Sequence, residues 1–127
     1  MPIERIQPPG VFTPANYVHV AKAGNTVYFA GQVARDSQGN VVGKGDVTAQ
    51  AIQAFENLKQ ALASVGADFS NLVKITVYLT DAGYQDAVTA VRSRYIVGAL
   101  PTATVAVLKA LGHPDMLVEI EAIAIVE

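Results

Sequence analysis

The sequence predicts a single α+β domain over residues 1–127, with two helices on one face of a sheet of about six strands. Three observations support this class. The 127 residues amount to one domain of ordinary size. Two stretches repeat apolar residues at three- and four-residue spacing, as helices with one buried face do. The other apolar stretches are rich in β-branched residues and are bounded by turn residues, in an order typical of a layered α+β fold.

The chain before the first predicted helix contains short strands. Prolines within the first nine residues suit a short edge strand and a stiff loop, because proline donates no hydrogen bond to a strand ladder. Residues 17–21 and 26–33 flank the turn dipeptide Gly24-Asn25, so they predict a hairpin. Residues 41–42 are both valine and predict a brief returning strand.

Two amphipathic helices are predicted. The first begins after Asp46, whose carboxylate suits an N-cap, and ends at Gly66. Its apolar stripe consists of Val47, Ala51, Ala54, Phe55, Leu58, Leu62 and Val65. The second helix begins after Asp81 and ends before Gly98 and Pro101. Its stripe consists of Tyr84, Val88, Val91 and Tyr95.

Three later strands are predicted, at residues 70–80, 102–108 and 117–126. The first alternates, and its predicted buried face consists of Val73, Ile75, Val77 and Leu79. The last two are apolar on both faces, whereas the helices cover only one face of the sheet. We therefore expect the other face to pack against copies of the same chain. A charged fraction of only 16% supports this homo-oligomer, because a small domain needs many polar residues to cover its surface.

The composition excludes several classes of function. The formal net charge is −2 and the nine lysines and arginines are scattered, which argues against a nucleic-acid partner. The absence of cysteine excludes disulfides, thiol catalysis and cysteine-bound zinc. The first residues lack the apolar core of a signal peptide, and no run of 18 apolar residues suits a membrane span. A cytoplasmic location without membrane contact is therefore expected.

Neither a cofactor nor a metal is expected. The glycines of residues 39–45 are too closely spaced for a phosphate-binding loop, and glycine rather than serine or threonine follows Lys44. His19 and His113 lie far apart in the sequence and belong to no motif of carboxylate ligands. Backbone groups or water are expected to satisfy each ring.

Glu119 and Glu121 are the strongest candidates for chemistry from the residues alone. Alternation places both carboxylates on one face of a mostly apolar strand, where a buried carboxylate costs free energy unless it is hydrogen-bonded. A functional role accounts for this pattern. So does an open strand edge at which both side chains face solvent, and the pattern leaves both interpretations open.

Several segments, taken together and in order, resemble one family. They are Tyr17, residues 24–32 (GNTVYFAGQ), Asn57-Leu58, residues 73–81 (VKITVYLTD), Pro101 and residues 118–125 (VEIEAIAI). The set resembles the RidA/YjgF family of reactive intermediate deaminases, formerly called L-PSP endoribonucleases, over nearly the whole chain. The resemblance implies a RidA-like fold, in which two helices pack on one face of a six-stranded mixed sheet, as in trimeric chorismate mutase. It also implies a homotrimer with a small-molecule cleft at each subunit interface.

The best-known branch of that family hydrolyses 2-imino acids. The resemblance implies that Tyr17 lines the cleft, that the backbone at Gly31 contacts the substrate, and that Glu119 positions the attacking water. In that branch an arginine in a Pro-Ala-Arg-Ser motif binds the substrate carboxylate. Ala103 stands at that position here.

The missing arginine predicts weak or absent 2-imino acid deaminase activity. A charge-assisted hydrogen bond contributes roughly 1.5–3 kcal/mol, and an arginine forms two with a carboxylate. Lys109 lies about 20 Å beyond Ala103 along an extended chain, which is too far for Lys109 to replace the missing arginine. Arg35 reaches the site only if the chain bends. Replacement of the missing arginine by Arg92 or Arg94 of a neighbouring subunit remains an open alternative.

Two functions of different classes therefore remain open. The first is an enzyme that hydrolyses an imine, an enamine or a related small metabolite with water positioned by Glu119. The second is a non-catalytic trimer that binds a metabolite or acts as a chaperone-like scaffold. Ribonuclease activity follows only from the older family name, and the acidic charge balance argues against it.

Overall fold

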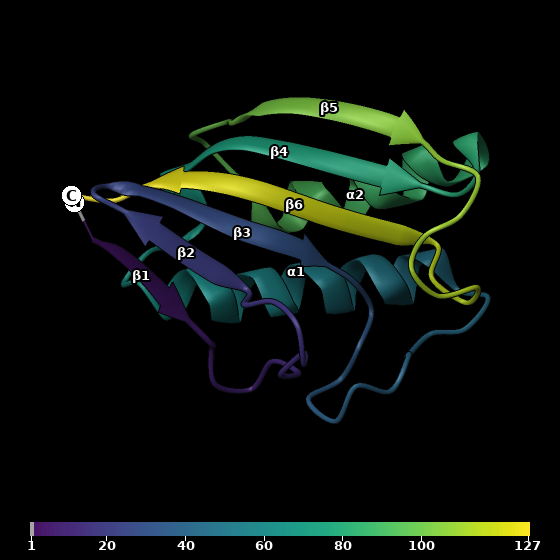
Figure 1. Ribbon diagram of the computed structural model, residues 1–127. Helices are drawn as coiled ribbons and strands as arrows, with labels where there is room; N and C mark the ends of the chain where they lie inside the picture. The colour runs from purple at the N-terminus through teal and green to yellow at the C-terminus, as the bar shows by residue number, and fades with distance from the viewer. Residues whose placement is uncertain (1) are drawn as a thin grey trace.

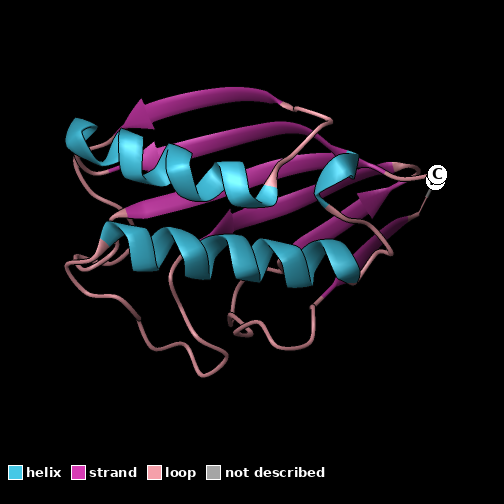
Figure 2. Cartoon of the chain, turned by 180° about the vertical axis from the view of Figure 1, so that it is seen from behind, coloured by secondary structure: helices cyan, strands magenta, loops and turns pink. Residues whose placement is uncertain are grey.

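The structure, a computed structural model, describes residues 2–127 (Figure 1). One mixed sheet contains β1 (Ile3–Ile6), β2 (Val20–Ala23), β3 (Thr26–Gln32), β4 (Leu72–Leu79), β5 (Thr102–Val107) and β6 (Val118–Ile125). Two helices, α1 (Val47–Ala63) and α2 (Gln85–Tyr95), lie on the same face of the sheet (Figure 2). The predicted α+β class, with two helices on one face of a six-stranded mixed sheet, is confirmed.

The last strand lies in the middle of the sheet. The strand order is β1-β2-β3-β6-β4-β5, so β6 is flanked by β3 and β4, antiparallel to both. Only β4 and β5 are parallel, because α2 carries the chain back across the sheet between them. The glutamates of β6 are therefore held between two neighbouring strands rather than at an open edge.

The core lies between the sheet and the two helices. Asp46 caps α1 as expected, its Oδ1 accepting from the backbone N–H of Ala49 at 3.0 Å. The predicted apolar stripe of α1 faces the sheet. The Phe55 ring in this stripe stacks on the Tyr95 ring of α2, with 5.1 Å between the ring centroids. The Tyr95 hydroxyl donates to Glu56 at 2.8 Å. Burial and this hydrogen bond raise the pKa of Tyr95 to about 12, so the link between the helices persists across the physiological pH range.

Three local expectations are corrected. Val73 is 43% exposed rather than buried, because an irregularity in the pairing with β6 between Leu72 and Lys74 shifts the alternation by one residue. Leu72 takes the buried place. The returning strand at residues 41–42 is reduced to a single bridge between Val41 and Arg35. Asp81 caps the single turn Ala82–Tyr84 that precedes α2, not α2 itself.

The face of the sheet away from the helices mixes apolar and polar side chains. Tyr28 and Ile125 are 51% and 40% exposed there. Tyr78 of β4 donates a hydrogen bond to Glu121 of β6 at 2.6 Å, and this bond raises the pKa of the tyrosine. Within residues 2–127, neither helix is long and apolar enough to cross a membrane.

Candidate functional site

Three of the four candidate site residues line one hollow. Tyr17, Gly31 and Glu119 face a space of about 290 Å³. The rest of its lining consists of Phe12, residues 14–16, Val33, Arg35, Gly112 and Met116. The loop between β1 and β2 and the loop between β3 and α1, which both contribute residues to this hollow, extend from the same end of the sheet (Figure 1).

Gly31 lies directly against the carboxylate of Glu119. A β-carbon added to Gly31 would lie 2.5 Å from Glu119 Oε2 and 2.6 Å from its Cδ, so the carboxylate would have to move to make room for it. The pairing of β3 with β6 is irregular between Phe29 and Gln32, and this irregularity brings Gly31 to the carboxylate. Glycine at this position therefore leaves the space that the Glu119 side chain occupies.

Glu119 is a half-buried carboxylate whose charged form is disfavoured. Burial raises its pKa, and the negative charge of Glu121 raises it further. Glu121 differs because it accepts the hydrogen bond from Tyr78 and faces a separate hollow of about 300 Å³ with Lys74. A carboxylate with a raised pKa in a concave site is suited to accept and return a proton.

His19 connects the loop that carries Tyr17 to β3. Gln32 Nε2 lies 3.0 Å from His19 Nδ1, and because an amide nitrogen only donates, Nδ1 accepts and Nε2 carries the proton. Nε2 then donates to the backbone oxygen of Phe12 at 2.7 Å. Burial lowers the pKa of His19, so the ring is neutral and joins β3 to the loop. The His19 and Tyr17 rings pack edge to face, with 5.6 Å between their centroids.

Arg35 enters the hollow because the chain bends after β3. Its backbone N–H donates to the Val33 oxygen at 2.8 Å. Asn57 of α1 donates from Nδ2 to the backbone oxygens of Val33 and Arg35 at 2.9 and 3.0 Å. Sequence reasoning missed this role of Asn57. The available signal was an amide beside the apolar stripe of a helix, where a buried polar group needs partners.

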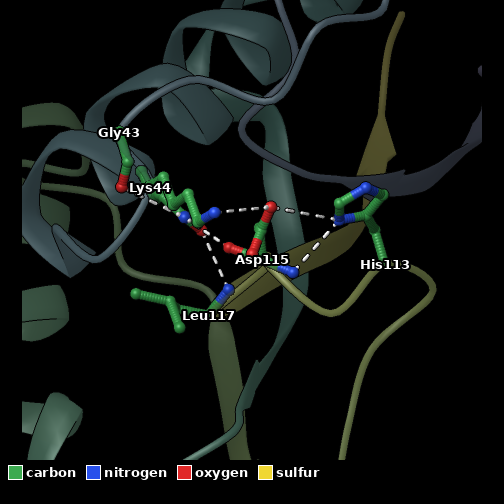
Figure 3. A network of polar contacts seen from close by, with 6 residues as sticks. Gly43, Lys44, His113, Asp115 and Leu117 are labelled. Carbon is green, nitrogen blue, oxygen red and sulfur yellow. Dashed lines mark hydrogen bonds and ion pairs between the residues drawn. The ribbon is translucent and has the colours of Figure 1, made fainter.

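Gln50 holds the loop that leads into β6, and sequence reasoning missed it as well. It is fully buried, donates to the Asp115 oxygen at 2.7 Å and accepts from the Leu117 N–H at 2.8 Å. Figure 3 shows Asp115 at the centre of the same network, with its N–H on His113 Nδ1 at 3.0 Å and its carboxylate 3.8 Å from Lys44 Nζ. Because Leu117 precedes β6 directly, this network sets the position of Glu119.

Ala103 lies apart from the other three residues. It pairs with Ile75, whose side chain is in the core on the helix side, whereas Glu119 pairs with Tyr78 on the opposite face. Ala103 instead lines a hollow of about 260 Å³ with Arg92 of α2. Within one chain, position 103 and Glu119 do not share a site. Residues 2–127 also contain no group of three or more histidine, aspartate and glutamate residues placed to hold a metal ion.

Comparison with known proteins gives concordant matches over the whole fold. The family model described as Endoribonuclease L-PSP matches residues 11–126. Protein DfrA of Myxococcus xanthus is 38% identical over 119 residues, covering 94% of this chain and 90% of that protein. The 2-iminobutanoate/2-iminopropanoate deaminase of Mus musculus is 36% identical over 109 residues, covering 86% of this chain and 80% of that protein. The crystal structure of RidA from an Antarctic Psychrobacter species has a TM-score of 0.89 at 29% identity, covering 97% of this chain and 99% of that one.

Proposed function

Because the chain belongs to the L-PSP endoribonuclease family, known also as the RidA/YjgF family, we propose that it hydrolyses the C=N bond of a small imine in the hollow that contains Glu119. The observation that carries the proposal is the half-buried Glu119 carboxylate, with a raised pKa, packed against Gly31 beside Tyr17. The name of the Mus musculus relative as an imine deaminase supports this reaction class. An enamine enters the same reaction through its imine tautomer.

Glu119 serves as the proton carrier of the reaction. Its carboxylate accepts a proton from water as the water oxygen attacks the imine carbon and the electron pair of the C=N bond moves to nitrogen. The protonated Glu119 returns this proton to nitrogen, which gives a carbinolamine. Glu119 then takes the hydroxyl proton of the carbinolamine and passes it to nitrogen as the C–N bond breaks, so the carbonyl forms and ammonia leaves. One imine and one water thus give one carbonyl compound and one ammonia, without a cofactor.

A homotrimer with the hollow at each subunit boundary is part of the proposal. The apolar residues exposed on the outer face of the sheet support it. The separation of Ala103 from Glu119 within one chain also supports it, because β5 is an edge strand that a neighbouring subunit can approach. We expect light scattering at micromolar concentration to give the mass of three chains. A monomer at that concentration would contradict both the trimer and the shared cleft.

The reaction is tested by supplying imines directly to the protein. We expect faster ammonia release than in the protein-free control when an amino-acid oxidase generates the imines in the assay. Among these substrates, 2-iminopropanoate and 2-iminobutanoate are expected to be poor, because Ala103 offers no charge to their carboxylate. If the folded protein accelerates hydrolysis of no imine in the panel yet still binds small ligands, it is a metabolite-binding scaffold instead.

A further inference from the structure

We propose that Arg35 binds an anionic group of the ligand in the hollow that contains Glu119, and hence that the substrate is an anion. The reaction part of this inference rests on the proposed function. The binding part rests on the surroundings of Arg35 itself. Neither the fold nor the position of Glu119 requires a cation at this place in the chain.

The guanidinium of Arg35 lacks the partners that a partly buried cation normally has. Its Nε is buried and has no hydrogen-bond partner among residues 2–127. The ion pair of Lys44 with Asp115 leaves Arg35 out, and no salt bridge within residues 2–127 includes Arg35. Arginine carries five N–H donors, and donors buried without partners cost free energy. A carboxylate in the hollow would pair with the unneutralised charge of this guanidinium.

The side chain is held in place before any ligand binds. Its Cζ lies 5.5 Å from the centroid of the Phe12 ring. That ring is fixed in turn against Gly39, where an added β-carbon would lie 2.6 Å from it. The Arg35 backbone is bound to Asn57 and paired with Val41. A group held in this way loses little conformational freedom on binding, which favours a role in recognition.

Arg35 and Glu119 line the same hollow but act on different parts of a ligand. No ion pair joins them within residues 2–127, and burial and Glu121 account for the raised pKa of Glu119. An imine whose anionic group is placed elsewhere than the carboxylate of a 2-imino acid therefore fits with that group toward Arg35 and its C=N carbon toward Glu119. Ala103 is outside this hollow. Arg35 thus supplies a cation in a different place from the family arginine that the resemblance implies.

The binding part is tested with two stable probes of the same shape, butanoate and its neutral amide butanamide, by NMR titration. We expect the native protein to bind butanoate at least about tenfold more tightly than butanamide, because a charge-assisted pair is stronger than a neutral hydrogen bond. Arg35→Leu is expected to remove this preference, and Arg35→Lys to retain part of it. The matched control Arg5→Leu removes the same charge from the exposed strand β1 and is expected to leave both affinities within about twofold.

Each contrary outcome overturns the role of Arg35. The first is an unchanged preference for butanoate in Arg35→Leu. The second is an equal loss of affinity for butanoate and butanamide in that variant. The third is a preference for butanoate that disappears only in Arg92→Leu. If Arg35→Leu fails to fold, the salt dependence of binding of both probes to the native protein is measured instead. Added salt should weaken butanoate binding and spare butanamide, and equal weakening would overturn the inference. Because the titration needs no turnover, loss of hydrolysis with intact butanoate preference refutes the proposed function alone. Hydrolysis without that preference refutes Arg35 alone.

Discussion

Replacing Glu119 by glutamine is expected to lower kcat/KM for imine hydrolysis by about 10²–10⁴-fold, the usual contribution of a general base. Glutamine preserves the shape of the side chain but accepts no proton. The measurement is steady-state hydrolysis of the best imine found for the native protein. The matched control is Glu121→Gln, two residues along the same strand and on the same face, which is expected to lose much less activity. Equal losses in the two variants would show that neither carboxylate is the base.

A second variant separates the position of the carboxylate from its presence. Gly31→Ala keeps Glu119 but places a β-carbon where the carboxylate lies, 2.5 Å from Oε2. The carboxylate must move, and activity should fall with it, because a base acts only within hydrogen-bond reach of the proton it takes. Full activity in a folded Gly31→Ala protein would contradict the close packing that we describe.

The pH dependence of activity follows from the raised pKa of Glu119. The base must be ionised, so kcat/KM should rise with pH and level off above the pKa of Glu119, later than for an ordinary glutamate. Burial is the larger cause of this shift and the charge of Glu121 the smaller. Glu121→Gln should therefore move the acid limb to lower pH by part of the shift. An unchanged acid limb in Glu121→Gln would show that the charge of Glu121 does not raise the pKa of Glu119.

The same pKa has a consequence for stability. Glu119 releases its proton at lower pH in the unfolded chain, at about 4.3, than in the folded protein. Its burial therefore costs no stability below the unfolded pKa and costs progressively more as pH rises through the folded pKa. Glu119→Gln should accordingly raise the melting temperature at pH 7 and leave it nearly unchanged below pH 4. A stabilised but inactive variant is the pattern of a residue retained for function.

The layout of the fold follows from patterns that are local in the sequence. The stripes of α1 and α2 indicate which face of each helix is buried, and the structure agrees. The irregularities beside Gly31 and at Val73 escape this reasoning, because one extra residue in a strand leaves no trace in composition. They depend on pairing with β6, which lies about 50 to 90 residues away in the chain.

The sequence predicts the candidate site to a similar extent. Glu119 and Glu121 stand out together because carboxylates are costly on an apolar strand, and only the family resemblance distinguishes Glu119. The bend that brings Arg35 into the hollow depends on hydrogen bonds from Asn57, 22 and 24 residues away. Gln50 likewise finds its partners 65 and 67 residues away. Such partners are chosen by the tertiary fold, so an extended-strand estimate of distance necessarily leaves Arg35 outside the site.

Ala103→Arg is expected to raise kcat/KM for 2-iminopropanoate and 2-iminobutanoate by at least about tenfold, because even one charge-assisted bond contributes roughly 1.5 kcal/mol. Arginine restores the planar donors that match a carboxylate. Ala103 is exposed on the edge strand β5, so the fold has room for the longer side chain. Because position 103 and Glu119 lie on opposite faces of one chain, the gain must come from a neighbouring subunit.

That requirement makes the assembly part of the test. In the proposed trimer, a mixture of Ala103→Arg and Glu119→Gln chains gives hybrid assemblies, in which an arginine from one chain can meet an intact Glu119 only on another Ala103→Arg chain. Diluting Ala103→Arg with Glu119→Gln chains should therefore reduce activity per intact Glu119 toward the native value. Constant activity per intact Glu119 would place the arginine and the glutamate of one chain in the same site, against the geometry of the fold. Robust turnover of these acids by the native protein would instead show that another cation already binds their carboxylate.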